Sequence, residues 1–392
     1  WNLVGKQNGE QGYMPWDKTK GNWLSGVSFI DNARLGNQDK LPSFMKDDQA
    51  RNKYYFIPLI LGLIGFAFQY RKRRNEWIAL LVLFFLTGIG IIIYSNQPPI
   101  EPRERDYVLV GSFFTFCIWI GLGGLAIGQF LVEKIKNNSI PLYAFAGLLA
   151  LLSPTLMGFQ NFDDMGSKGI YASRDYASNF LNSVEPNAII FTYGDNDTYP
   201  LWYAQEVEGI RTDVRVVNLS LIAVDWYIDQ QRRKINNSAP IKMTIPSDSY
   251  RGNKRNQIYY VTSDMSNQEL PANTVLKFIG ESHPLEGTNS KAESFLPTNK
   301  MYIPIDKAGW INKKFLSAQD SILDKIPVSF DVKEQGDYVL KGDLAVMDII
   351  ASNINDRPVY FSVTADPSRF LGLNQYMQLE GLALRIIPVR ST

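Results

Sequence analysis

The sequence predicts a multi-spanning α-helical membrane region followed by a soluble α/β domain with a largely parallel sheet. Two observations lead to this fold class. Four long apolar runs lie within the first 160 of the 392 residues, although the mean hydropathy of the whole chain is only −0.14. After residue 160, short β-rich runs alternate with stretches of helical spacing, as in a soluble domain. The mean hydropathy therefore hides two regions of different character.

The four apolar runs contain no Lys, Arg, Asp or Glu, and they predict four transmembrane helices. Each is close to or above the roughly 20 residues that cross a hydrocarbon core of ~30 Å, and aromatic residues stand at the run ends. Gly121–Gly124, inside the third run, indicates close helix packing. Short charged loops between the runs favour membrane spans over a buried core. The runs are Tyr54–Tyr70, Trp77–Tyr94, Tyr107–Val132 and Pro141–Phe159.

The charges between the runs predict the orientation. Arg71–Arg74 places four consecutive cations between the first two runs, and short basic loops stay cytoplasmic. Residues 1–53 are then an external loop region, and residues 161–392 are an external domain. We expect a multi-pass protein of the bacterial inner membrane with this C-terminal domain in the periplasm. Because the chain opens on Trp1 without a signal peptide, we expect an internal fragment whose preceding span is missing.

The composition excludes several classes of function. A formal charge of +1, from 40 Lys and Arg against 39 Asp and Glu, argues against nucleic acid as a partner, since nucleic-acid modules usually carry a basic excess. Cys117 and His283 are the only residues of their types, which rules out a disulfide framework, a Cys-based zinc cluster and a His triad. We therefore assign no metal ligands and no cofactor.

The region after residue 160 predicts alternating strands and helices. Residues 188–219 form a strand–helix–strand pattern, which is typical of a βαβ unit with a parallel pair. The expected helices are Tyr171–Ser183, Pro200–Glu208, Trp226–Asn236, Leu344–Asn353 and Gln375–Ala383. The expected strands are Ala188–Thr192, Val214–Leu219, Gln257–Thr262, Thr274–Ile279, Val359–Val363 and Leu384–Val389.

The loop Asn96–Tyr107 is the first candidate site. Three prolines within five residues stiffen it, and two arginines follow at or near the start of the third run. A helix N-terminus attracts anions, and arginine offers a planar fork for phosphate oxygens, so an anionic lipid headgroup is the expected ligand. The alternative is interfacial snorkelling with solvated ion pairs. The candidate donor-phosphate residues are Arg103, Glu104, Arg105 and Asp106.

The segment Gly194–Tyr203 is the second candidate site. It follows an expected strand, and ligands of open α/β sheets gather at the carboxyl ends of strands. Acidic and amide side chains could bind a cation or sugar hydroxyls, and aromatic rings could stack on a sugar. In the alternative reading, Asp197 or Thr198 caps the helix and the aromatic rings fill the core. The candidate acceptor- or sugar-binding residues are Asp195, Asn196, Asp197, Tyr199 and Trp202.

Several of these motifs resemble a large membrane protein family that is common in Bacteroidota and related to protein O-mannosyltransferases. The segments that carry the resemblance are Asn96–Tyr107, Gly194–Tyr203, Ala204–Ser220 and Asp225–Gln230. The similarity covers most of the chain, including Trp1–Asp48. It implies the multi-spanning GT-C architecture.

The resemblance also implies a glycosyltransferase that uses a polyprenyl-phosphate-linked sugar at the external membrane face. Arg103 and Arg105 would neutralise the lipid-linked phosphate, and Glu104 and Asp106 would orient them. The catalytic acid of that architecture usually lies in the first external loop, upstream of this sequence, so the catalytic residue of this chain is unknown. The partners implied are membrane lipid, the polyprenyl-phosphate sugar, and a protein or glycan acceptor, which the α/β domain would bind.

Two alternatives remain open on the sequence. One is a non-catalytic membrane-anchored glycan-binding protein, with Asp195–Tyr203 as its recognition surface. The other is a structural protein of an envelope complex that has kept the fold without the chemistry. An acidic residue in the first external loop of the complete sequence would favour the enzyme.

Overall fold

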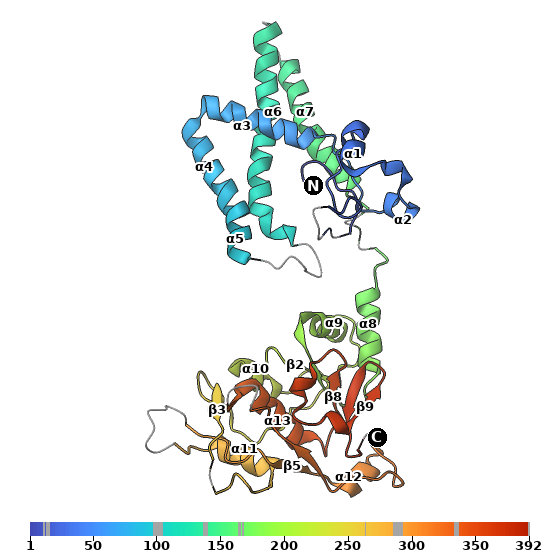
Figure 1. Ribbon diagram of the computed structural model, residues 1–392, viewed down its shortest axis with the longest axis vertical. Helices are drawn as coiled ribbons and strands as arrows, with labels where there is room; N and C mark the ends of the chain where they lie inside the picture. The colour runs from blue at the N-terminus through green and yellow to red at the C-terminus, as the bar shows by residue number, and fades with distance from the viewer. Residues whose placement is uncertain are drawn as a thin grey trace. The chain divides into compact units, whose positions relative to one another are not determined.

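The computed structural model describes residues 1–10, 12, 16–96, 105–135, 140–163, 166, 168–262, 264–284, 293–332 and 337–390. It divides into two compact units, residues 1–168 and 169–392 (Figure 1). The first unit is helical apart from its N-terminal segment, and the second combines strands and helices.

The first unit begins with a loop-rich segment, which is followed by five helices of different lengths, α3 to α7. The N-terminal segment holds α1 (Ser28–Leu35), a 3-10 turn (Gln38–Lys40) and α2 (Ser43–Lys46). The helices that follow are α3 (Ile57–Lys72), α4 (Arg74–Phe85), α5 (Ile91–Ser95), α6 (Val110–Ile135) and α7 (Ile140–Gln160). A π-helical turn, Leu86–Gly90, joins α4 to α5, and a 3-10 turn, Asp106–Leu109, leads into α6.

Among the described residues, three helices are long and apolar enough to cross a membrane: Arg74–Ser95, Asp106–Ile135 and Ile140–Gln160. The predicted span at 54–70 is not one of them. Its helix, α3, has 16 residues and is therefore about 24 Å long, less than the ~30 Å hydrocarbon core. Tyr55 and Phe56 have positive φ values of 52° and 59°, so the helix begins only at Ile57. The sequence pattern had counted these aromatic residues as part of the span.

Helix α3 runs across α6 in close backbone contact (Figure 1). A Cβ atom at Gly65 would lie 1.8 Å from the Trp119 carbonyl oxygen, and one at Gly123 would lie 2.1 Å from the Leu61 carbonyl oxygen. On the other side of α6, a Cβ at Gly124 would lie 2.5 Å from a side-chain carbon of α7. The close packing predicted for Gly121–Gly124 is confirmed at Gly123 and Gly124.

The N-terminal segment contacts one end of the helices. The Asn52 side chain donates to Asn161 Oδ1 just after α7 (2.9 Å), and Asn161 in turn donates to the Tyr54 hydroxyl (2.7 Å). Asn2 donates to Asp106 at the start of the span that contains α6 (3.4 Å). These contacts bring together three segments that the loop charges place on one side of the membrane. The identity of that compartment stays a prediction.

A five-stranded sheet forms the centre of the second unit, in the order β2-β1-β8-β10-β9. The first three strands run parallel, and β10 runs antiparallel to both of its neighbours, β8 and β9, so the sheet is mixed where the sequence predicted a largely parallel one. The βαβ unit at residues 188–219 is confirmed. The strands are β1 (Ile189–Thr192), β2 (Arg215–Asn218), β8 (Val359–Ser362), β9 (Met377–Glu380) and β10 (Ala383–Ile386).

Helices cover both faces of this sheet. Side chains of α8 and α9 pack on one face around Ile190, Val216 and Tyr360, and those of α11 and α13 pack on the other around Phe191 and Phe361. The helices are α8 (Ala172–Asn182), α9 (Gly194–Glu206), α10 (Asp225–Gln231), α11 (Ala272–Gly280), α12 (Lys307–Asn312) and α13 (Lys341–Asn353). Two small sheets complete the unit, with strands β3 (Gln257–Tyr259), β7 (Tyr338–Leu340), β4 (Leu270–Pro271), β5 (Met301–Pro304) and β6 (Lys325–Val328).

Two of the expected elements are of another type in the structure, and others differ in their bounds. Thr274–Ile279 was expected as a strand but lies in α11, whose Ala272, Val275, Leu276 and Ile279 are buried at helical spacing. Gln375–Ala383 was expected as a helix but contains β9 and the turn into β10, at which Gly381 has a φ of 59°. Helix α9 begins at Gly194 rather than Pro200, and α10 ends at Gln231 rather than Asn236.

Candidate functional site

The three parallel strands end in a buried polar network beside the first turns of α9. Thr192 ends β1, and its hydroxyl lies 2.7 Å from that of Thr198 on α9. Asn218 ends β2 and donates from its side chain to the Thr198 hydroxyl (2.9 Å). All three side chains are buried. Hydrogen bonds among buried polar groups fix their positions, so this network holds the start of α9 against the carboxyl edge of the sheet.

Asp197 belongs to the same buried layer. It is 6% exposed, and its carboxylate accepts hydrogen bonds from the Ser362 hydroxyl at the end of β8 (2.8 Å) and from the Thr364 hydroxyl. Its Oδ2 also accepts from the Tyr193 backbone N–H (3.4 Å). Of the predicted sugar-binding residues, Asp197 therefore ties α9 to β8 instead of facing solvent.

The other predicted residues of α9 are more accessible. Asp195, Asn196 and Tyr199 are exposed, and Trp202 is half-buried. The Asp195 charge, together with a hydrogen bond to its carboxylate, raises the pKa of the Tyr199 phenol. Because Asp195 and Asp197 both lie in the first turn, the positive end of the helix dipole is already matched by acidic side chains. The N-terminus of α9 thus suits a neutral polar ligand better than a phosphate.

A pocket of about 540 Å³ lies between α9, β2 and α10. Trp202 of α9 and Trp226 of α10 line it, together with the amide side chains of Gln205, Gln230 and Gln231. Trp226 is 59% exposed. Ring contacts continue from Tyr199 to Trp202 (5.7 Å between centroids), to Tyr227 (6.5 Å) and to Trp226 (5.7 Å). The predicted aromatic residues Tyr199 and Trp202 thus belong to a longer row that leads along this pocket.

The charged groups of the pocket already have partners. Arg215 is 2% exposed and donates to four backbone carbonyls, including those of Gln231 (3.0 Å) and Ala239 (2.9 Å). Burial lowers the pKa of Arg215 to about 10. Glu206 accepts a hydrogen bond from the Asn236 side chain (2.7 Å). The remaining polar surface is mainly amide, as expected of a site for neutral hydroxyl groups.

Gln231 supplies an unsatisfied acceptor at this pocket. The residue is 1% exposed, and its Nε2 donates weakly to the Tyr227 carbonyl oxygen (3.4 Å). Its Oε1 is buried and accepts no hydrogen bond from any residue that the structure describes. A buried acceptor without a partner costs roughly 1–3 kcal/mol, so a donor group brought by a ligand would relieve that cost.

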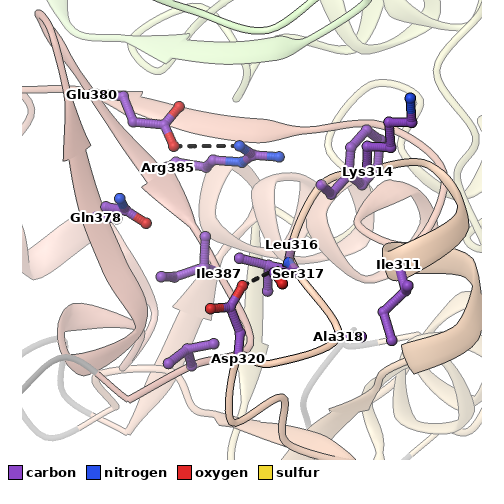
Figure 2. A pocket seen from close by; sticks show the side chains of 12 residues that line it. Ile311, Lys314, Leu316, Ser317, Ala318, Asp320, Gln378, Glu380, Arg385 and Ile387 are labelled. Carbon is purple, nitrogen blue, oxygen red and sulfur yellow. Dashed lines mark hydrogen bonds and ion pairs between the residues drawn. The ribbon is translucent and has the colours of Figure 1, made fainter.

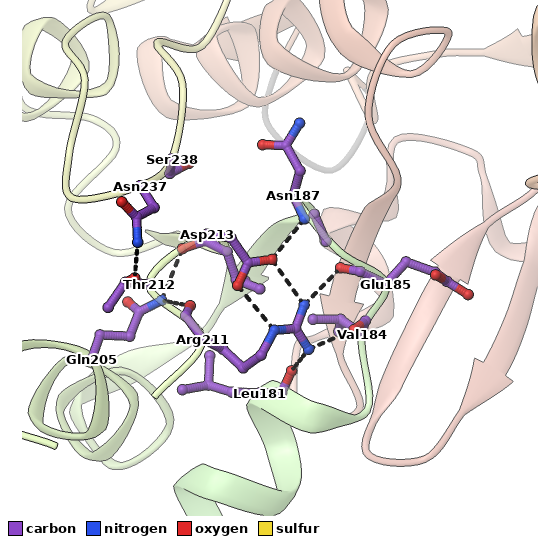
Figure 3. A network of polar contacts seen from close by, with 12 residues as sticks. Leu181, Val184, Glu185, Asn187, Gln205, Arg211, Thr212, Asp213, Asn237 and Ser238 are labelled. Atoms are coloured by element: carbon purple, nitrogen blue, oxygen red, sulfur yellow. Dashed lines mark hydrogen bonds and ion pairs between the residues drawn. The ribbon is translucent and has the colours of Figure 1, made fainter. Parts of the chain in front are cut away.

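A second polar network fixes the loop that leads from α9 into β2 (Figure 3). The Arg211 guanidinium donates to the carbonyl oxygens of Leu181 (2.8 Å) in the last turn of α8 and of Val184 (3.0 Å) and Glu185 (3.0 Å) just after it. It also forms an ion pair with Asp213 (3.0 Å). On the α9 side, Gln205 Nε2 donates to the Arg211 carbonyl oxygen (2.9 Å). One arginine therefore connects α8, α9 and the segment that leads into β2.

We expect Asp213→Asn to lower the stability of the protein at neutral pH but not in acid. The hydrogen bond from Arg211, with a further one from the Asn187 N–H (2.8 Å), lowers the pKa of Asp213 in the folded chain. A carboxyl group whose pKa is lower in the folded than in the unfolded chain stabilises the folded protein at pH values above its unfolded pKa of about 3.9. This stabilisation disappears as the pH falls through the pKa of the folded state. Thermal unfolding of the full chain in detergent, measured at pH 7 and then in steps from pH 4 downward, follows this loss. Asp248→Asn, in an exposed ion pair with Arg251, is the control; an equal effect there would contradict the assignment.

The predicted donor-phosphate residues lie in the first unit. Arg105 is exposed, directly before the span Asp106–Ile135, and Asp106 begins the 3-10 turn into α6. Arg103 and Glu104 lie outside the described residues, so the prediction for the four residues as a group stays a prediction. Across the described part of the chain, no cluster of three His, Cys, Asp or Glu side chains could hold a metal ion.

Sequence reasoning missed Trp226 and Gln231 as pocket residues. Trp226 carried no clear signal, because its exposure is known only from the folded chain. Gln231 carried none, since its role depends on where α10 packs. Both come from a segment that is distant in sequence from Trp202 and meets it only in the folded domain.

Membrane-spanning helices followed by a mixed-sheet α/β domain define a membrane protein with a folded C-terminal domain. Residues 173–392, more than half of the chain, match a family model described as TMEM260-associated domain 2. The chain belongs to this family. The match covers α8 to β10 and therefore both the polar network and the pocket. No solved structure matches the chain.

Proposed function

We propose that the chain is part of a membrane glycosyltransferase that moves a sugar from a polyprenyl-phosphate donor to an acceptor at the external membrane face. The family match supports the resemblance to protein O-mannosyltransferase relatives, since TMEM260 is itself related to them. The GT-C architecture and the periplasmic orientation are parts of this proposal. The enzymatic step would use the lipid-linked sugar, and the acidic residue that would activate the acceptor is not assigned.

The pocket between α9 and α10 is the observation that supports a glycan-binding role for the α/β domain. Aromatic rings stack on the apolar face of a sugar, and amide groups exchange hydrogen bonds with its hydroxyls. Trp202, Trp226 and Gln231 supply these groups around a volume that suits a small ligand. We assign to this pocket the glycan part of the acceptor. Asp195 and Asn196, exposed at the start of α9, would extend the polar contacts.

We expect Trp226→Ala to weaken glycan binding roughly tenfold, because the exposed indole contributes contact area without stabilising the core. Saturation-transfer NMR with methyl α-mannoside, using the full chain in detergent, measures this. Trp16→Ala is the matched control, since Trp16 is 74% exposed in the other unit. Equal signals from wild type and Trp226→Ala, or equal signals from mannoside and an acyclic polyol, would contradict the assignment.

A non-catalytic glycan-binding protein is the alternative that the same pocket would serve. Membranes that contain the complete protein separate the two. Transfer of labelled sugar from a polyprenyl-phosphate donor supports the enzyme, and glycan binding at the pocket without any transfer supports the alternative.

A further inference from the structure

A second pocket, of about 650 Å³, opens where β9 and β10 meet the loop that follows α12 (Figure 2). Arg385 of β10 lies on its inner side, and Lys314 of the loop lies across from Gln378 and Glu380 of β9. The strand register places Arg385 between Gln378 on β9 and Tyr360 on β8, so these residues form one row across three strands. This pocket is lined by none of the residues of the α9–α10 pocket.

Arg385 is a buried cation, with a side chain that is only 6% exposed. Two aromatic rings lie near its guanidinium group. The distance from Arg385 Cζ to the ring centroid is 5.5 Å for Phe315 and 5.8 Å for Tyr360. One nitrogen, Nη1, donates to Glu380 Oε1 (3.3 Å). The other Glu380 oxygen accepts from the Tyr360 hydroxyl (2.7 Å), so this acid is held in place from two sides.

The remaining edge of the guanidinium group has no acceptor among the residues that the structure describes. Nε and Nη2 of Arg385 are both buried, and neither donates a hydrogen bond to a described residue. These two nitrogens form the side of the group whose parallel N–H bonds match the two oxygens of one carboxylate or phosphate. Buried charged donors without an acceptor are costly, so an incoming anion would bind to groups that are already oriented and poorly solvated.

The charges around the pocket favour a group with a single negative charge. Lys314 adds a second cation, and Asp320 and Glu380 add two acids. Asp320 accepts a hydrogen bond from the Ser317 N–H (2.6 Å), as Figure 2 shows. The two acids would repel a doubly charged phosphate more strongly than a carboxylate, which carries only one negative charge. Apolar side chains complete the lining, among them Leu316 and Ile387.

We propose that this pocket binds a small organic carboxylate with an apolar body, held by the Nε–Nη2 edge of Arg385 and assisted by Lys314. The site goes beyond the glycan pocket, because it recognises an anion rather than neutral hydroxyls. It gives the α/β domain a second ligand site that does not depend on transferase activity.

The test is fluorine NMR of 4-fluorobenzoate with the full chain in detergent. We expect a dissociation constant on the order of 1 mM, as for other ligands of this size. Arg385→Met keeps the apolar stem and should weaken binding at least about tenfold, and Arg385→Lys should recover only part of the loss. Lys314→Asn should weaken binding about threefold. It leaves the fold intact, since Lys314 has a φ of 59° and asparagine tolerates that conformation. The control is Arg390→Gln, an exposed arginine of the same domain, with unchanged binding.

Three results would overturn the proposal. One is equal binding by wild type, Arg385→Met and Lys314→Asn. Another is equal binding of 4-fluorobenzoate and its neutral analogue 4-fluorobenzamide. The third is displacement of 4-fluorobenzoate by an equal concentration of inorganic phosphate, which would identify a phosphate site. Failure of the mannoside experiment would leave this result untouched, because the two pockets share no residue.

Discussion

Arg105→Ala is expected to reduce sugar transfer by the complete protein about 100- to 1,000-fold while membrane insertion stays normal. The expectation rests on the proposed donor site. Arg105 is exposed and directly precedes Asp106, where the span that contains α6 begins. As the sugar leaves, charge develops on the lipid phosphate, and a charge-assisted hydrogen bond that strengthens in the transition state supplies an effect of this size. Transfer of labelled sugar from a polyprenyl-phosphate donor, measured in membranes, checks it.

Two further variants separate catalysis from anchoring. Arg105→Lys should recover only part of the rate, because a point charge does not reproduce the planar fork. Arg74→Ala removes an exposed cation at the start of another span, Arg74–Ser95, and should leave transfer unchanged. If Arg105→Ala and Arg103→Ala both keep near wild-type turnover, the loop serves only as an interfacial anchor and the donor-site hypothesis fails.

The parts of the fold that could be predicted are those determined by local sequence patterns. Helices α4 to α7 follow from apolar runs without charges, because length and hydropathy alone decide whether a helix can span a membrane. The βαβ unit follows from the local order of strand and helix patterns. The span predicted at 54–70 is not confirmed, because the left-handed conformations of Tyr55 and Phe56 shorten the helix, and hydropathy does not detect backbone conformation.

The elements that were missed depend on tertiary packing. In β9, Met377 is buried and Gln378 and Leu379 are both exposed, so the segment lacks the strict alternation of a half-buried strand, and only its pairing with β10 defines it as one. The candidate sites show the same division. Tyr199 and Trp202 could be selected from their place after a strand, but Arg385 is an ordinary strand residue until Phe315, Tyr360 and Glu380 surround it.

The crossing of α3 and α6 carries the largest expected effect on stability. A Cβ at Gly123 would lie 2.1 Å from the Leu61 carbonyl oxygen, and the obstacle is backbone rather than a flexible side chain. The two helices would therefore have to separate, which would also break the buried hydrogen bond from Trp119 Nε1 to Gln69 Oε1 (2.8 Å). We expect Gly123→Leu to destabilise the membrane unit by about 3 kcal/mol or more.

Gly121→Leu is a matched control on the same helix. Apart from the neighbouring backbone of α6 itself, a Cβ at Gly121 meets no atom of the described residues within 4 Å, so this variant adds an equal apolar volume without a clash at Cβ and should change stability by less than about 0.5 kcal/mol. Unfolding in mixed micelles of rising dodecyl sulfate fraction, followed by tryptophan fluorescence, gives the two midpoints. Since Cβ itself is the clashing atom, Gly123→Ala should already show most of the loss. Equal midpoints for the Gly121 and Gly123 variants would mean that α3 does not press on α6 in the folded protein.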